Sequence, residues 1–248
     1  MSNNDVKVKV TNLTKCFGDL KVLDNVSFEV KEGDFLCIVG PTGCGKTTFL
    51  NSLTKLYDIT SGEILVNGEP VDLKKHNIAY IFQEYSTMPW LTVEENISFG
   101  LQIKGFSKET IKEKVENVAK LVGLEQYLDY YPGQLSASML QRVVIARAFA
   151  VEPELLLMDE PYGQLDIELR FRLEDELLNL WEKTGTTVIF ITHNIEEAVY
   201  LGERILVLTN KPTHIKEEII NDLPRPRDIT HPDFVALRNR VTDLIKWW

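Results

Sequence analysis

Nine consecutive residues combine the groups that bind a chain of phosphates: Gly40, Pro41, Thr42, Gly43, Cys44, Gly45, Lys46, Thr47 and Thr48. They fit the pattern of a phosphate-binding loop, in which a glycine and four variable residues precede glycine, lysine and a hydroxyl residue. Glycines let backbone N–H groups close around phosphate oxygens, and a helix N-terminus adds partial positive charge. The segment therefore predicts a nucleotide site. Lys46 would bind the outer phosphates, Thr47 would ligate Mg²⁺ and Thr48 would contact the α-phosphate.

The residues on either side decide between this prediction and a glycine-rich turn with a solvated lysine. Residues 35–39 are apolar, which predicts a buried strand, and residues 48–53 are typical of the start of a helix. A strand, a loop and a helix are the setting that the motif requires, so we favour the phosphate site. We interpret Cys44 as a small filler residue in this loop; the alternative is a redox switch.

Two adjacent carboxylates follow a second apolar run. Residues 155–158 are Leu-Leu-Leu-Met, and Asp159 and Glu160 come directly after them. At the tip of a core strand, Asp159 can hold Mg²⁺ through water and Glu160 can act as general base on the attacking water of phosphoryl transfer. The alternative is two solvated acids at a strand end. The presence of the phosphate-binding loop favours the catalytic interpretation.

Two more polar residues stand at the ends of apolar runs. Gln83 follows residues 78–82, and His193 follows residues 186–192. Ligands of α/β proteins bind beyond the carboxyl ends of the strands, so Gln83 is a candidate ligand of water or metal and His193 a candidate γ-phosphate sensor. A loop glutamine bonded to backbone and a solvated histidine are the alternatives.

The elements that must position these residues follow from hydrophobic periodicity. Strands are expected at residues 6–11, 22–30, 35–39, 61–68, 78–82, 155–160, 186–192, 205–208 and, at a sheet edge, 213–221; helices are expected at 107–123, after 136, at 168–183 and at 232–246. Ser136 is placed to cap the helix that follows it. Phe17 falls in a turn, where it fits either a core position or a stack on a nucleotide base. The fold class is α/β.

Composition narrows the class of protein. The chain has 248 residues, 44% hydrophobic and 26% charged, with a formal net charge of −10. This negative balance disfavours broad binding to nucleic acid or anionic lipid. No run of about 18 apolar residues is present, and the N-terminal residues do not resemble a secretory signal. The three cysteines lack paired spacing, which argues for a reducing compartment and against disulfides or zinc.

Six motifs in sequence order resemble those of the ATP-binding subunits of ABC transporters: GPTGCGKT, IFQE, LSASMLQR, LLLMDEP, GQLD and ITHN. The resemblance covers about the whole chain and implies a single nucleotide-binding domain over residues 1–248. Its fold would be a P-loop NTPase (RecA-like) core with an antiparallel β subdomain and a helical signature subdomain. We expect the helical subdomain at about residues 84–150 and a C-terminal tail, residues 223–248, packed on the body. Sequence does not decide whether Trp247 and Trp248 anchor that tail.

The resemblance also assigns roles to residues. Phe17 would stack on adenine, Gln83 would sense Mg²⁺ and couple to the membrane subunit, and His193 would hold the γ-phosphate. Lys46, Thr47 and Thr48 match the phosphate and magnesium contacts, Asp159 the magnesium-associated carboxylate, Glu160 the catalytic base and Asp166 the aspartate that crosses the dimer. The implied assembly is a head-to-tail dimer of identical subunits with two ATP molecules between them.

The signature departs from the family pattern, LSGGQ or LSGGM. Here Ser136 is kept, but Ala137 and Ser138 replace the glycines that let backbone amides approach the γ-phosphate of the second subunit. If either position needs a left-handed backbone, the cost is roughly 1–2 kcal/mol. The Ser138 hydroxyl can itself donate to phosphate. The sequence thus predicts ATP binding, with dimer closure or hydrolysis slowed.

The expected function is ATP binding and hydrolysis that energises a membrane importer. Two stretches, 84–101 and 223–238, look most like the nitrate, sulfonate, taurine and bicarbonate importer branch. Expected partners are a second copy of the chain, membrane permease subunits and, indirectly, a solute-binding protein, but no nucleic acid. The expected location is peripheral, at the cytoplasmic face of the membrane.

Contact with the permease is expected near Gln83, through Met88, Trp90 and Leu91, which otherwise form a local mini-core. The alternative function is a low-turnover, ATP-dependent regulatory or binding subunit, suggested by the altered signature. A nucleic-acid or ribosome-associated ATPase is a further alternative, which the single cassette and acidic charge disfavour.

Overall fold

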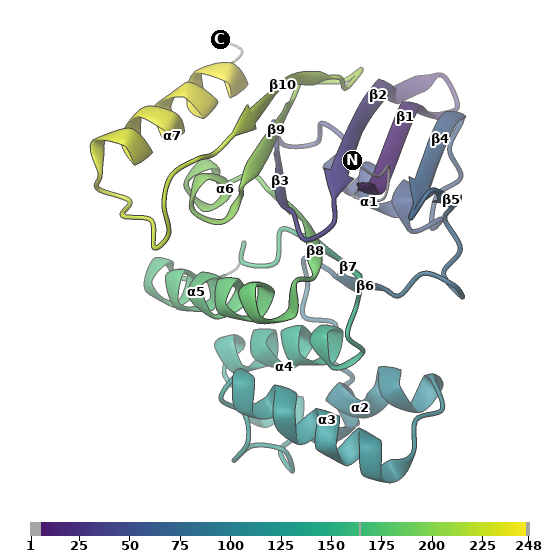
Figure 1. The fold of residues 1–248 in the computed structure, drawn as a ribbon, viewed down its shortest axis with the longest axis vertical. Coiled ribbons are helices and arrows are strands. Elements are labelled where there is room, and N and C mark those ends of the chain that lie inside the picture. The colour runs from purple at the N-terminus through teal and green to yellow at the C-terminus, as the bar shows by residue number, and fades with distance from the viewer. Residues whose placement is uncertain (1–5, 164, 247–248) are drawn as a thin grey trace. The chain divides into compact units, whose positions relative to one another are not determined.

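The computed structural model describes residues 6–163 and 165–246. Gln164 of the GQLD motif and the Trp247–Trp248 pair lie outside the described residues. The chain forms two compact units, which we describe separately. Unit 1 comprises Met1–His76 and Thr187–Trp248, and unit 2 comprises Asn77–Thr186. The helices and strands of both are labelled in Figure 1.

Unit 1 contains an antiparallel sheet with strand order β2-β1-β4-β5. Its strands are β1 (Val6–Phe17), β2 (Leu20–Lys31), β4 (Ser61–Val66) and β5 (Glu69–Pro70). Val8, Val26 and Val30 are buried while their neighbours are less so, as alternation along a half-buried strand predicts. Phe17 is the last residue of β1 rather than part of a turn, because β1 continues six residues past the alternating segment and pairs Phe17 with Leu20.

Unit 1 also contains four paired strands in the order β10-β9-β3-β8. They are β3 (Phe35–Val39), β8 (Thr187–Thr192), β9 (Arg204–Leu208) and β10 (Ile215–Ile220), accompanied by α1 (Lys46–Leu53), α6 (Ile195–Leu201) and α7 (Pro232–Ile245). β3 pairs in parallel with β8 and β9, and β10 is antiparallel at the edge, as predicted. Every residue of β3 and β8 is buried, which explains the apolar run of β3 and the apolar centre of β8.

The C-terminal helix α7 packs within unit 1. It contacts α6 and β9 and buries Phe234 and Val241. Arg227 in the preceding segment donates to the carbonyls of Val199, Tyr200 and Gly202 at 2.8–2.9 Å. These acceptors lie at the C-terminal end of α6, where carbonyls lack partners within the helix.

Unit 2 combines two parallel strands with helices. They are β6 (Ile78–Ile81), β7 (Leu155–Asp159), α2 (Val93–Ile103), α3 (Lys108–Leu121), the 3₁₀ turn η1 (Pro132–Gln134), α4 (Ala137–Ala150) and α5 (Ile167–Thr184). α2, α3 and α4 contact one another (Figure 1). Thr92, Ser107 and Ser136 accept hydrogen bonds from the first turns of these helices. The predicted cap at Ser136 is confirmed.

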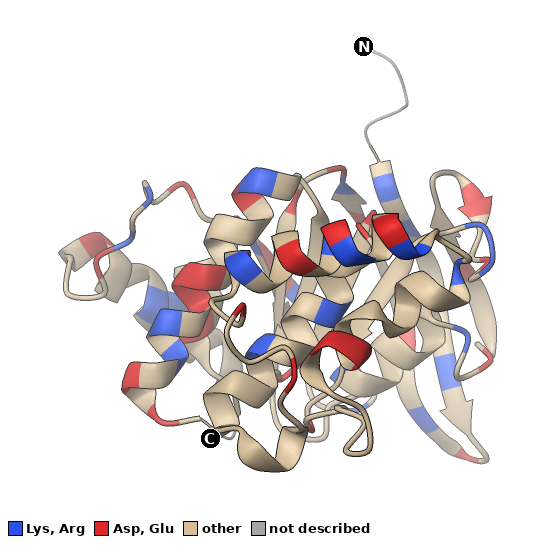
Figure 2. Cartoon of the chain, turned by 90° about the horizontal axis from the view of Figure 1, so that it is seen from below, with Lys and Arg blue, Asp and Glu red and all other residues tan. Residues whose placement is uncertain are grey.

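Charged residues of both signs are interspersed along the chain (Figure 2). No helix among the described residues is long and apolar enough to cross a membrane. None of the three cysteines, all of which the structure describes, forms a disulfide.

Candidate functional site

Strand register in unit 1 brings two predicted site segments to one edge. Val39 of β3 is paired with Thr192 of β8, and both strands end there. The phosphate-binding loop begins at the next residue, Gly40, and His193 follows Thr192. These two segments thus leave the sheet side by side, at the carboxyl edge where α/β proteins bind ligands. His193 is exposed, in the turn before α6.

The loop itself is held by backbone geometry. Gly43 and Gly45 have φ of +76° and +115°, which side-chain-bearing residues rarely adopt. A Cβ at Gly45 would lie 2.8 Å from Cγ1 of Val22, so no side chain fits. Lys46 is only 5% exposed, and its ammonium group donates to the carbonyls of Gly40 and Pro41 at 3.1 and 3.3 Å. The lysine is therefore anchored along the rim of the loop.

The start of α1 is suited to an anion. Its N-cap is Gly45, which provides no side-chain cap, and the first turn of the helix contains no acidic residue. By contrast, α2 through α7 all begin with a side chain that accepts from the first turn. The first N–H groups of α1 and the exposed Thr47 hydroxyl thus form a donor set that fits phosphate oxygens. Cys44 is 1% exposed, and burial raises the pKa of its thiol.

Phe17 is not a core residue. Its side chain is 43% exposed, it contacts Tyr57 edge-to-face at 5.4 Å, and the Lys15 ammonium lies 4.6 Å from its ring centroid. An exposed aromatic with a nearby cation is consistent with the predicted stack on a nucleotide base.

Strand register in unit 2 aligns a second group of site residues. Ile81 of β6 is paired with Met158 of β7, so Gln83 follows β6 at the edge where Asp159 and Glu160 end β7. Asp159 is 5% exposed, and the Tyr80 hydroxyl donates to its Oδ2 at 3.3 Å. Sequence reasoning missed Tyr80. Its position in the strand next to the carboxylate strand was the available signal.

Glu160 has an unusual backbone. Its φ is +47°, in the left-handed region that costs a side-chain-bearing residue roughly 1–2 kcal/mol. Strain of this kind is concentrated at functional sites, where it directs a side chain. Here it redirects the chain immediately after β7, at the residue predicted to be the general base.

The signature segment lies at the N-terminus of α4. Ser136 caps the helix, and its hydroxyl lies 3.0 Å from that of Ser138. Ala137 and Ser138 are the first two helical residues, and neither has positive φ. The left-handed backbone that would have penalised these side chains is therefore not needed. Asp166 is exposed and caps α5 by accepting from Leu169 N–H at 3.0 Å.

Oxygen donors of the kinds that bind magnesium are present in each unit. Thr47 in unit 1 offers a hydroxyl, and Gln83 and Asp159 in unit 2 offer an amide and a carboxylate. Among the described residues there is no cluster of three His, Cys, Asp or Glu side chains. Hydroxyl, amide and carboxylate oxygens of this kind suit Mg²⁺, which is bound by one or two carboxylates together with phosphate oxygens and water.

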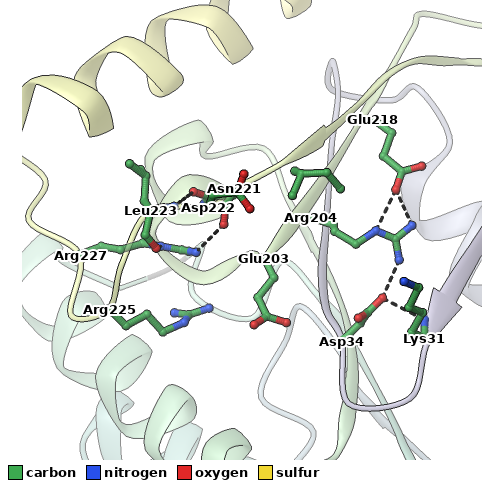
Figure 3. A pocket seen from close by; sticks show the side chains of 11 residues that line it. Lys31, Asp34, Glu203, Arg204, Glu218, Asn221, Asp222, Leu223, Arg225 and Arg227 are labelled. Carbon is green, nitrogen blue, oxygen red and sulfur yellow. Dashed lines mark hydrogen bonds and ion pairs between the residues drawn. The ribbon is translucent and has the colours of Figure 1, made fainter. Parts of the chain in front are cut away.

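A separate cavity in unit 1 has different chemistry. It has a volume of about 680 Å³ and is lined by four basic and four acidic side chains: Lys31, Arg204, Arg225, Arg227, Asp34, Glu203, Glu218 and Asp222. Arg204 bridges Asp34 and Glu218 (Figure 3). Its lining is balanced in charge and Arg204 is already engaged by two carboxylates, unlike the uncapped start of α1, so we do not assign the nucleotide there.

Comparisons with known proteins identify the family of the chain. The profile of the ABC transporter family matches residues 23–163. An uncharacterized ABC transporter ATP-binding protein of Methanocaldococcus jannaschii is 46% identical over 97% of this chain and 92% of its own length. The aliphatic sulfonates import ATP-binding protein SsuB of Bacillus thuringiensis is 41% identical over 94% of each chain.

Solved structures give the same result. The ABC transporter cassette MJ0796, solved as a dimer, matches with a TM-score of 0.76 and 32% identity over 88% of this chain and 100% of its own. It has also been solved in a post-hydrolysis state with ADP and Pi. The predicted α/β fold of a P-loop NTPase is thereby confirmed.

Proposed function

The chain belongs to the ABC transporter family, as an ATP-binding subunit with ATPase activity, and from this premise we propose that it powers the import of a small anion. One observation carries the proposed cargo class, the 41% identity to an aliphatic sulfonates import protein over 94% of both chains. Sulfonates, taurine, nitrate and bicarbonate are the candidate anions. We further propose that permease subunits and a solute-binding protein complete the importer and hold this chain at the cytoplasmic face.

The proposed cycle uses the residues located above. Two copies of the chain bind two ATP molecules head to tail, and the dimeric structure of MJ0796 supports this assembly. Phe17 stacks on adenine, while Lys46, Thr47 and Thr48 contact phosphates. Ser136 and Asp166 are exposed, which leaves them available to the second copy.

Hydrolysis depends on the residues that end the strands. Glu160 accepts a proton from the attacking water, and His193 orients the γ-phosphate. A general base in this role contributes typically ~10²–10⁴ in rate. Thr47, Gln83 and Asp159 would hold Mg²⁺, which supplies charge stabilisation at the phosphates when bound.

We place the permease contact on unit 2. Trp90 is 72% exposed, whereas Met88 and Leu91 are half-buried. Asn96 fixes the backbone around Trp90 by donating to the carbonyls of Met88 and Leu91 at 3.1 Å each. A rigid turn that presents an exposed indole is typical of an interface anchor.

A groove in unit 2 offers a second contact. It has a volume of about 300 Å³ and lies between β6, α2 and α4, with Phe99 and Ile103 in its lining. Ile103 is 71% exposed. Exposed apolar side chains beside a groove are characteristic of protein-binding surfaces.

Transport into membrane vesicles tests the proposal. The chain is co-expressed with the permease genes adjacent to its own gene, and ATP-driven uptake of sulfonate, taurine, nitrate and bicarbonate is measured. Uptake of one anion that stops in Glu160→Gln supports the proposal, and the absence of ATP-dependent uptake of all four contradicts the cargo class.

A second assay tests the contact surface. Trp90→Glu and Ile103→Glu should each release the chain from its permease in a co-purification assay. Leu73→Glu, at a side chain 54% exposed in unit 1, is the matched control and should leave assembly intact. Normal assembly of both unit 2 variants would refute the proposed contact.

A further inference from the structure

A buried threonine outside every motif contacts the phosphate-binding loop. Thr213 lies in the turn between β9 and β10 and is fully buried. Its hydroxyl donates a hydrogen bond to the carbonyl of Cys44, in the middle of the loop. No motif assigns a role to this turn. The contact with Cys44 connects Thr213 to the phosphate-binding loop.

Thr213 is itself fixed in place. Its N–H donates to the carbonyl of Val22 at 2.9 Å, and its carbonyl accepts from Asp24 N–H at 3.0 Å. β2 thus binds both the N–H and the carbonyl of Thr213. The β2 side chains of Val22 and Leu23 lie next to Gly45. The turn is closed separately, because Thr209 N–H donates to the His214 carbonyl at 3.0 Å.

The consequence for the loop follows from the planar peptide. The Cys44 carbonyl and the Gly45 N–H belong to one trans peptide unit and point in opposite directions. Because the Thr213 hydroxyl binds that carbonyl, it directs the Gly45 N–H away from Thr213. Glycine at φ +115° allows this peptide to rotate with little steric resistance, so sequence alone does not fix its orientation. The hydroxyl of Thr213 provides the missing constraint.

A second contact from the same hairpin supports the loop. A Cβ at Gly40 would lie 3.0 Å from Cβ of Leu208, the last residue of β9. The hairpin therefore lies against the loop at its start and at its centre. In addition, the charge of Lys211 in this turn, like that of Lys46, acts to lower the pKa of the Cys44 thiol against the larger effect of burial.

We propose that Thr213 is a positioning residue for nucleotide binding, which holds the Cys44–Gly45 peptide in the orientation that presents the Gly45 N–H to the phosphates. The inference rests on the proposed role of the loop as the ATP site. A backbone donor to the β-phosphate binds ADP and ATP alike, so loss of the constraint should weaken both equally. Turnover at saturating ATP should change little, because such binding is uniform between ground and transition states.

Titration of fluorescent ADP and ATP analogues into the full chain measures the Kd of each nucleotide and so tests the role of Thr213. Thr213→Val replaces the hydroxyl with a methyl group of similar size, and we expect the Kd for both nucleotides to rise about tenfold. Thr213→Ser keeps the donor and should restore the Kd to within twofold of wild type. KM for ATP should rise with the Kd while kcat stays within twofold.

Thr209→Val is the matched control, since it removes a hydroxyl that belongs to the same turn but makes its hydrogen bonds within that turn. Its hydroxyl donates only within the turn, to the carbonyls of Asn210 and His214. We expect an unchanged Kd even if the melting temperature falls. If Thr213→Val does not fold, Thr213→Ala takes its place, and the order Ser tighter than Ala is the expected result.

The outcomes separate two kinds of failure. If Lys46→Ala binds ADP and ATP as tightly as the wild-type chain does, the loop is not the ATP site. Binding that needs Lys46 but is unchanged in folded Thr213→Val or Thr213→Ala would overturn the role of Thr213 alone. A Thr213→Val effect equal to that of Thr209→Val would likewise overturn it, because the effect would come from the turn.

Discussion

Restoring glycines to the signature should not improve the enzyme. In the double variant Ala137→Gly with Ser138→Gly, the expected gain in ATPase activity is nil, since both residues already have helical backbone without positive φ. The substitution instead introduces two flexible residues at the start of α4. Glycine in a helix is less stable than alanine by roughly 0.5–1 kcal/mol, so the pair should lower the free energy of unfolding by about 1–2 kcal/mol.

Two measurements on the same preparation test this prediction. For a chain of this size, a loss of 1 kcal/mol lowers the melting temperature by roughly 2–4 °C, so thermal unfolding should shift down by about 2–8 °C. Steady-state ATP hydrolysis at 25 °C should remain within twofold of wild type. An increase in turnover of tenfold or more would refute the reasoning, because it would show that the two side chains obstruct the site.

Three further predictions concern single residues. Gly45→Ala should abolish nucleotide binding while the chain stays folded by circular dichroism, because a methyl group 2.8 Å from Cγ1 of Val22 forces the loop to move; retained affinity would contradict this. Arg227→Met should lower the melting temperature by about 6–12 °C, since three buried hydrogen bonds are lost at about 1 kcal/mol each, while Asn221 and Arg225 still donate to the same carbonyls; thermal unfolding checks it, and a shift below 2 °C is the contrary result. Cys44 should react with a maleimide far more slowly than Cys16, because burial raises the pKa of Cys44 and keeps it protonated until higher pH; mass spectrometry of labelled peptides decides, and equal rates at pH 7 would support a redox role instead.

The fold was predictable where one physical signal dominated. Buried parallel strands such as β3 and β8 are apolar, apart from the threonine at each end of β8, and they are followed by the loop and by His193. Periodicity does not show which strands pair or in which register. The structure pairs Val39 with Thr192, and this long-range contact places the phosphate-binding loop and His193 at the same edge of the sheet.

Three features of the site were not accessible from the sequence. The signature backbone required the structure, because alanine and serine fit a helix start as well as a turn. The left-handed conformation of Glu160 is set by its surroundings, since glutamate has no preference for it. Thr213 lies 169 residues from Cys44, and a threonine in a polar turn gives no sign of such a contact.

Turnover and dimerisation of the wild-type chain beside Glu160→Gln most directly test whether the proposed ATP site drives this protein. ATP hydrolysis and ATP-dependent dimerisation are measured on both, the second by size-exclusion chromatography with light scattering. We predict turnover by wild type, and loss of turnover with a stable ATP-bound dimer in Glu160→Gln. Wild-type turnover that persists in Glu160→Gln would contradict Glu160 as the general base, and ATP binding without dimerisation or hydrolysis would contradict the two-ATP mechanism.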